Sequence, residues 1–401
     1  MEPEERLRKY AELAVRVGAN VAPGQIVAVS GFVEHAPLVR AIVRAAYEAG
    51  ARYVDAQYLD AHVHRAHIEL GPDESLTWTP PWSLSRLKYF GEERGAFIST
   101  TGDPEPHLLE DLPGERVGKA RPVELAEESI RQLNERLWNW TGVACPNDGW
   151  ATSVFGEPDV ERLWEAVAFC TRLDEADPVA AWNEHMTELE RRADDLNALG
   201  VDELRYRGPG TDLTVGLLPE SQWGAARFRT AWDHAYVPNM PTEEVFTTPD
   251  RRRTEGTVRS TRPLSLFGTV VEDLELRFEG GGIVDVRASA GADVVSGELA
   301  TDENARFLGE VALVDGNSRV GQTGLTFFDV LYDENASCHL AYGAGLSYGI
   351  EGDPDGDGFN VSAVHTDFMV GGPEVDVDAV THDGAVVPVL RDNAWVLERH
   401  A

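Results

Sequence analysis

The sequence predicts an α/β N-terminal domain with a parallel sheet, followed by a β-rich α+β C-terminal domain. Three observations carry this prediction: the length of 401 residues, a βαβ pattern near the start, and a change from helical to short-strand patterns near residue 200. A chain of this length is typical of two domains. Its hydrophobic content of 42% and charged content of 26% are those of a globular protein. We expect domains at 1–200 and 201–401.

The first half alternates between helical and strand patterns. Apolar residues recur at helical spacing over 4–17, and the run QIVAVSG (25–31) then predicts a buried strand. Residues 34–50 return to helical spacing, and 51–59 read as a strand again. These segments predict one βαβ unit with a parallel strand pair and a right-handed crossover. Further strands of the same sheet are predicted at 95–100 and 140–146.

The second half changes to a β-rich pattern after a charged helical stretch at 157–199. The segments ELRYR and LTVGL flank the turn sequence GPGTD, which predicts a β-hairpin over 203–217. Short strand candidates separated by Gly, Asn and Asp follow it, at 265–271, 274–279, 281–289 and 310–315. We therefore place the domain boundary near residue 200.

The net charge of −34 is the unusual feature of the composition. Such a surface repels phosphate groups, so we expect no nucleic-acid partner and no membrane partner. Two explanations stay open: a halophilic adaptation to high salt, or a GC-rich genome that encodes Arg in place of Lys. The sequence shows no apolar run of about 20 residues and no apolar signal at the N-terminus. We expect a cytoplasmic chain with reduced, buried cysteines.

Candidate catalytic residues concentrate between 239 and 372. Glu243 and Glu244 are adjacent in an apolar setting. On an extended chain neighbours point to opposite faces, so only one of the two can face a given site. Glu310 precedes the apolar run 311–314, where an unpaired buried carboxylate would be costly. Taken singly, these residues are also compatible with a surface pair and a solvent-facing strand start.

Two histidines complete the candidate set. His339 lies among small and apolar residues, where a hydrogen-bonded core histidine is the ordinary interpretation. His365 and Asp367 are two residues apart, so on a strand they share one face. Two imidazoles and several carboxylates in one β-rich half are the ligand set of hydrolytic two-metal sites. Such donors suit Zn, Mn, Co or Fe rather than copper or an iron–sulfur centre.

Four segments, in this order along the chain, resemble the motifs of the aminopeptidase T / aminopeptidase S family: NMPTEEVFT, LGEVALV, DENASCHLA and HTDFMVGG. RTEGTVRSTRPL (253–264), GTDLTVGL (210–217) and the opening ANVAPGQIVAVSG also resemble family segments. The resemblance covers nearly the whole chain and is strongest after residue 203. It implies a cytoplasmic two-metal aminopeptidase that forms a homodimer with an enclosed catalytic cavity.

The resemblance also implies a site in the C-terminal domain. It implies two divalent metal ions per chain, with Zn, Co, Mn and Mg as candidates, and a peptide substrate with a free N-terminus. By motif position the metal ligands are Glu244, Glu310, His339, His365 and Asp367. Glu243 is a candidate base or amine anchor, and Tyr348 a candidate oxyanion donor.

Two features depart from the family pattern. Family members carry a tyrosine seven residues after the motif histidine, where this chain has Leu346, and Tyr348 comes two residues later. The role of that tyrosine is therefore either filled by Tyr348 or absent. The segment DPDGDGF (353–359) matches half of a calcium loop but has valine at the twelfth position, which favours an acidic surface loop.

The alternative enzyme is a mononuclear Fe(II) ring-cleaving dioxygenase of the dihydroxypyridine type. It would need only His339, His365 and Asp367 as a facial triad. The presence of Glu244 and Glu310 favours the two-metal hydrolase. A metal-dependent binding or storage module is the non-enzymatic alternative, and the five ligand-type residues in an apolar frame argue against it.

Overall fold

The first half of the molecule is built on a parallel sheet, as the sequence predicts. The computed structural model describes residues 2–266, 268–352, 356 and 358–397. The sheet has the strand order β10-β4-β3-β1-β2. Its strands are β1 (Ile26–Phe32), β2 (Tyr53–Leu59), β3 (Ala96–Thr101), β4 (Asn139–Ala144) and β10 (Asn239–Met240). The predicted βαβ unit is confirmed, because β1 and β2 pair in parallel from Ile26 opposite Tyr53 to Phe32 opposite Leu59.

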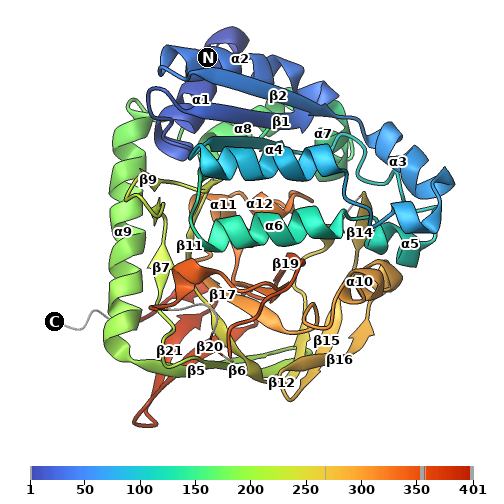
Figure 1. Ribbon diagram of the computed structural model, residues 1–401. Coiled ribbons are helices and arrows are strands. Elements are labelled where there is room, and N and C mark those ends of the chain that lie inside the picture. Colours follow the sequence, from blue (N-terminus) through green and yellow to red (C-terminus); the bar gives the residue numbers. More distant parts are fainter. Residues whose placement is uncertain (1, 267, 353–355, 357, 398–401) are drawn as a thin grey trace.

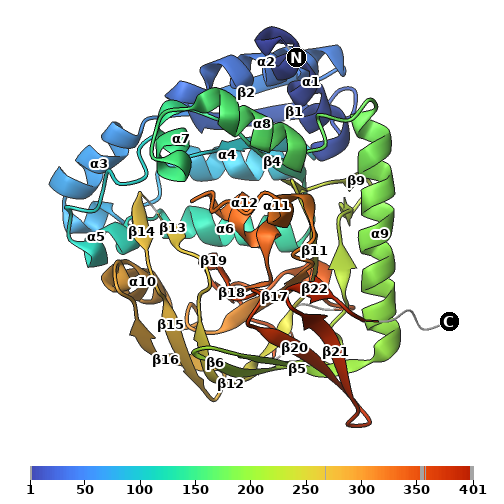
Figure 2. The same cartoon turned by 180° about the vertical axis from the view of Figure 1, so that it is seen from behind.

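Helices cover both faces of this sheet. Figure 1 shows α4 and α6 in front of it, and Figure 2 shows α7 and α8 on the other side. The predicted N-terminal helix is α1 (Pro3–Leu13), which continues as a π-helical turn (Ala14–Gly18). The other helices of this half are α2 (Ala36–Glu48), α3 (Ala61–Leu70), α4 (Pro81–Glu92), α5 (Gly114–Lys119), α6 (Val123–Asn134), α7 (Asp148–Phe155) and α8 (Val160–Cys170).

A long helix, α9 (Pro178–Leu199), connects the two halves and runs along one side of the molecule (Figure 1). Asp177 caps its start by accepting a hydrogen bond from the Ala180 N–H, and Gly200 ends it with a positive φ of 65°. The next strand begins at Val201. Strand β10, however, leaves the second half and pairs in parallel with β4. The second half therefore adds an edge strand to the first sheet.

Antiparallel sheets make up the second half. One has five strands in the order β19-β18-β17-β11-β7, and the other has eight in the order β16-β15-β12-β6-β5-β20-β21-β22. The five strands are β7 (Gly224–Ala225), β11 (Glu244–Thr247), β17 (Leu308–Val314), β18 (His339–Gly343) and β19 (His365–Met369). The eight are β5 (Val201–Gly208), β6 (Thr211–Leu217), β12 (Pro249–Arg259), β15 (Glu275–Glu279), β16 (Gly282–Arg287), β20 (Asp376–Thr381), β21 (Val386–Arg391) and β22 (Ala394–Trp395).

Short elements complete this half. The two-stranded sheets are β8 (Phe228–Arg229) with β9 (Ala235–Tyr236), and β13 (Leu264–Leu266) with β14 (Thr269–Val271). The helices are α10 (Ala292–Leu299), α11 (Arg319–Gln322) and α12 (Val330–Asp333). The predicted hairpin is the β5–β6 pair, in which Gly208 lies opposite Thr211. The prediction of a β-rich second half is thus confirmed.

Several further expectations concern single residues. The three cysteines are free and buried. Among the helices that the structure describes, none is long and apolar enough to cross a bilayer. Of the predicted acidic loop, residues 353–355 and 357 lie outside the described residues.

Candidate metal centre

The five-stranded antiparallel sheet brings the predicted ligands together on one face. Glu244 starts β11, Glu310 lies on β17, His339 starts β18, and β19 carries both His365 and Asp367. Because side chains alternate along a strand, His365 and Asp367 point to the same side. The register of the strands brings Glu310 close to Asp367, because Ala341 of β18 lies opposite both of them. Cross-strand partners point to the same face, so the small side chain of Ala341 lies between these two carboxylates.

The candidate ligand atoms form two overlapping groups. Glu244, Glu310 and His339 make one, and Glu310, His365 and Asp367 make the other, with donor atoms within 4.8 Å of one another in each. His339 Nε2 lies 3.0 Å from Glu244 Oε2, and His365 Nε2 lies 3.2 Å from Glu310 Oε2. Glu310 belongs to both groups, so its carboxylate lies between them.

Backbone carbonyls orient both histidines. His339 Nδ1 lies 2.9 Å from the Glu334 carbonyl oxygen, and His365 Nδ1 lies 2.8 Å from that of Ala344. A carbonyl can only accept, so each Nδ1 carries the proton and donates it. Each Nε2 is thereby directed at the carboxylates, which is the orientation found in metal-ligating histidines.

The electrostatics of the cluster show an excess of buried negative charge. Burial lowers the pKa of His365, but Asp367 and Glu310 outweigh it and raise that pKa to about 9. Burial also opposes a charge on His339, yet Glu244 and Asp367 hold its pKa well above the usual value. The pKa of Glu310 is raised, first by burial and then by the neighbouring carboxylates. A divalent cation would relieve this repulsion.

A sixth residue joins the cluster that the sequence analysis did not single out. Glu334, 6% exposed, lies in the short 3₁₀ helix Glu334–Ala336, five residues before His339. Burial and the charge of Asp367 raise its pKa well above the usual range, and His339 partly offsets this. The only sequence signal was a second carboxylate inside the segment DENASCHLA. Glu334 reaches the cluster because the 3₁₀ helix Glu334–Ala336 precedes β18 and brings it back toward the sheet.

The adjacent glutamates separate, as the alternation of an extended chain requires. While Glu244 faces His339, the Glu243 carboxylate lies 3.0 Å from Arg172 Nη2 and 3.2 Å from His185 Nε2. The Glu243 backbone N–H donates to Asn335 Oδ1 at 2.6 Å. Glu243 is therefore held by α9 and by the chain that leads into it.

Tyr348 lies in an aromatic cluster beside the site. Its ring stacks on Phe228 with centroids 4.1 Å apart, and its hydroxyl lies 2.8 Å from that of Tyr236. The cluster includes Phe246, which shares a strand face with Glu244, and Ala312, which lies opposite His339. Burial raises the pKa of Tyr348 to about 12, so its hydroxyl stays protonated at neutral pH. Leu346 packs against the same cluster.

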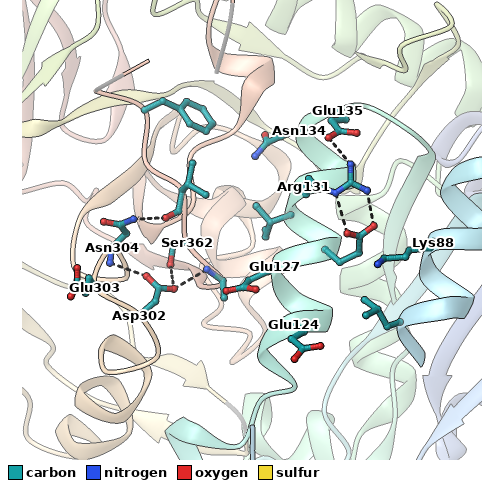
Figure 3. Close-up of a pocket in the computed structure, with 16 residues that line it drawn as sticks. Lys88, Glu124, Glu127, Arg131, Asn134, Glu135, Asp302, Glu303, Asn304 and Ser362 are labelled. Atoms are coloured by element: carbon teal, nitrogen blue, oxygen red, sulfur yellow. Dashed lines mark hydrogen bonds and ion pairs between the residues drawn. The ribbon is translucent and has the colours of Figure 1, made fainter. Parts of the chain in front are cut away.

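A cavity of about 900 Å³ adjoins the strand that carries His365 and Asp367. It lies between α4 and α6 of the first half and the segments 302–304 and 359–363 of the second (Figure 3). Ala363 lines it two residues before His365, and Asp302 holds this wall by accepting hydrogen bonds from the Ala363 N–H and the Ser362 hydroxyl. Most of its charged lining is acidic, which suits a cationic ligand.

Comparison with known proteins defines the class. Residues 3–395 match the family described as thermophilic metalloprotease (M29). Aminopeptidase T of Thermus aquaticus is 42% identical over 98% of this chain and 99% of that protein. Aminopeptidase AmpS of Bacillus subtilis is 37% identical over 98% of each. The solved structure of wild-type AmpT from Thermus thermophilus superposes with a TM-score of 0.86 and 40% identity, covering 98% of this chain and 99% of that one.

Fold, donor set and relatives together define a metal-dependent peptidase. The chain belongs to the M29 family of thermophilic metalloproteases. A 2,5-dihydroxypyridine dioxygenase from Pseudomonas putida KT2440 shares the fold, with a TM-score of 0.52 at 13% identity over 99% of this chain and 98% of that one. That likeness concerns the fold alone, and it gives the dioxygenase alternative no support as a function.

Proposed function

We propose that this metal-dependent aminopeptidase releases N-terminal residues from peptides with water activated at a two-metal centre on the five-stranded antiparallel sheet. The observation that carries the proposal is the pair of overlapping donor groups that share Glu310. Glu244 and His339 would hold one ion, His365 and Asp367 the other, and Glu310 would bridge them. Glu334 is a further candidate ligand or a partner of the ligands.

The donor set supports two divalent cations. Carboxylates and imidazoles suit Zn, Co or Mn, and Mg would rely on the carboxylates. When bound, such ions lower the pKa of a shared water and polarise a carbonyl group. The chain's own contribution is to fix both imidazoles through the Glu334 and Ala344 carbonyls. Nε2 of each is thus the atom directed at the ion, and the raised pKa values of both imidazoles mean that its proton would leave when an ion binds.

Two further residues keep the roles predicted for them as part of this proposal. Tyr348 can donate a hydrogen bond to a developing oxyanion, because its hydroxyl remains protonated. Glu243 as a base or amine anchor stays a prediction. Its ion pairs with Arg172 and His185 support a role in which it orders the chain before β11.

The test combines metal analysis with matched peptides. We expect two divalent ions per chain and stepwise release of residues from a peptide with a free α-amine. The acetylated peptide lacks the charge that the acidic site would bind, and sites built around such a group reject analogues without it by roughly 10⁴-fold. Equal rates on both peptides, or internal cuts, would contradict the proposal. A single iron with ring cleavage would instead support the dioxygenase.

We further propose that the chain forms a homodimer through the segment 51–90. Eight of the fifteen large hydrophobic side chains exposed in the described residues belong to it, including Val63 at 68% and Trp82 at 69%. It carries five carboxylates and four Arg or Lys residues, so it is nearly neutral in a chain of net charge −34. Two copies of so acidic a protein can approach most easily where the charge is low. Light scattering of Val63→Asp and Trp82→Glu variants tests this interface.

A further inference from the structure

The face of β19 opposite the candidate metal site holds a buried carboxylate. Glu298, on α10, is completely buried and accepts three hydrogen bonds. The Thr366 hydroxyl donates to it at 3.0 Å and the Tyr342 hydroxyl at 2.6 Å. Thr366 lies between His365 and Asp367 and points the other way, because side chains alternate along the strand. Tyr342 is the cross-strand partner of Thr366 on β18.

The third donor comes from the first half of the chain. Arg121, between α5 and α6, donates from Nη2 to Glu298 Oε1 at 2.5 Å. Its Nη1 donates to the carbonyl of Ala363, two residues before His365, at 3.1 Å. One guanidinium therefore contacts both the carboxylate behind β19 and the backbone that leads into it.

Close helix packing brings these groups together. A Cβ added at Gly118 of α5 would lie 2.4 Å from the Val294 carbonyl oxygen of α10. A Cβ at Gly297 of α10 would lie 2.9 Å from the Glu115 carbonyl oxygen. Glycine at both positions lets the two helices touch backbone to backbone, which places Arg121 beside Glu298.

We propose that Glu298 and Arg121 are positioning residues for His365 and Asp367. Their hydrogen bonds to Thr366 and to the Ala363 carbonyl hold the backbone of β19 in position on the face opposite the candidate metal site. The side chains of His365 and Asp367 therefore project from a fixed stretch of backbone. This inference rests on the proposed function, in which His365 and Asp367 hold one ion. It makes the geometry of that ion depend on a residue of the first half.

The physical reason is the cost of leaving any member of this buried network unpaired. Three donors converge on one carboxylate, and a glutamine has only one acceptor oxygen to offer them. With Glu298→Gln the charge paired with Arg121 is lost, and the amide N–H₂ group faces at least one of the donors, which must then move or, if it is a hydroxyl, turn to accept. Thr366 is the donor that lies on β19, so a change in its hydrogen bond would displace the strand that carries His365 and Asp367. Partners of this kind typically affect metal affinity by roughly 10–100-fold.

The test measures Co²⁺ affinity by chelator competition, together with the Co²⁺ absorption spectrum. We expect Glu298→Gln to weaken Co²⁺ binding by roughly 10–100-fold and to change the spectrum. Thr366→Val removes only the hydroxyl on the ligand strand and should give a smaller change of the same kind. Thr366→Ser keeps the hydroxyl and should restore the original affinity and spectrum.

Two controls separate positioning from general stability. Ile42→Val creates a small cavity in α2 of the first half and should lower the melting temperature without moving Co²⁺ affinity. Glu161→Gln breaks the Arg6–Glu161 ion pair, also in the first half, and should leave the spectrum unchanged.

Unchanged affinity and spectrum in Glu298→Gln and Thr366→Val would overturn the inference. If Glu298→Gln does not fold, the comparison of Thr366→Val with Thr366→Ser decides it. If the unsubstituted chain binds no Co²⁺, the proposed function fails, and this inference fails with it.

Discussion

Two clusters of buried carboxylates in this molecule differ in the groups that surround the carboxylates. Asp329 and Asp333, at 7% and 1% exposure, are satisfied by the fold itself. Asp329 Oδ2 accepts from the Gly102 N–H at 2.9 Å, and Asp333 Oδ1 from the Phe327 N–H at 2.9 Å. Arg262 also lies 3.3 Å from Asp333. In the second cluster, called the sheet cluster, the carboxylates of Glu244, Glu310 and Asp367 face two imidazoles and one another on the five-stranded antiparallel sheet.

The difference teaches how to separate a structural acid from a candidate ligand. Burial raises the pKa in both clusters, to about 7 for Asp329 and about 6 for Asp333. A perturbed pKa therefore does not distinguish them. What distinguishes them is the partner: backbone N–H groups and a guanidinium fix a carboxylate in place, whereas converging carboxylates and Nε2 atoms need a cation.

The largest expected effect is the loss of turnover when the sheet cluster is changed. We expect Glu310→Ala, His339→Ala, His365→Ala and Asp367→Ala each to lower kcat/KM by more than about 100-fold, the upper cost of losing an outer partner. The metal-free fold should survive Glu310→Ala and Asp367→Ala, because each removes crowded negative charge. His339→Ala and His365→Ala remove a positive partner of these carboxylates and should lower the melting temperature. Activity and metal content, with melting curves in chelator, measure both. Normal activity in two of these variants would refute the site.

The glutamate pair sharpens this prediction. Glu244→Gln should lower metal content, whereas Glu243→Gln should leave it unchanged, because Glu243 contacts Arg172 and His185 instead. The reverse pattern would mean that the other carboxylate is the ligand.

A smaller effect is expected at Asp329, on stability rather than on turnover. Its pKa of about 7 in the folded state lies above the usual unfolded value of about 3.9. Its contribution to stability is thus full below about pH 4 and is lost as the pH rises through 7. Asp329→Asn removes this loss, so the variant should gain free energy of unfolding relative to the unsubstituted chain between pH 5 and 8. The gain should reach at most about 4 kcal/mol.

Urea unfolding at pH 5, 6.5 and 8 measures that difference. The exposed Asp273→Asn, whose carboxyl pKa is lowered by Arg259, serves as control and should show no such gain. A difference between Asp329→Asn and the unsubstituted chain that stays constant with pH would contradict the structural role of Asp329.

The smallest effect is expected from salt, which acts on exposed charge and little on either buried cluster. With a net charge of −34, self-repulsion opposes folding, and screening relieves it. We expect the melting temperature to rise by about 1–2 °C, which corresponds to a gain of about 1–2 kcal/mol in a chain of 401 residues, between 0.05 and 2 M KCl. Scanning calorimetry over that range measures it. A flat profile would favour a GC-rich genome as the origin of the acidic composition.

The sequence by itself determined what depends on local geometry. The period of two along a strand separates Glu243 from Glu244 and joins His365 with Asp367, and the structure has both arrangements. Helical and strand periodicity likewise predicted the parallel βαβ unit and the β-rich second half. These features can be predicted from the sequence because each depends only on residues a few positions apart along the chain.

Only the tertiary structure decided what depends on register and on contacts between the halves. It placed Glu334 beside the candidate ligands, Ala341 between Glu310 and Asp367, and Arg121 against Glu298. It also moved β10 into the first sheet. Arg121 and Glu298 are 177 residues apart, and no local pattern specifies which two strands or helices meet across such a distance. That choice follows from packing the whole core at once.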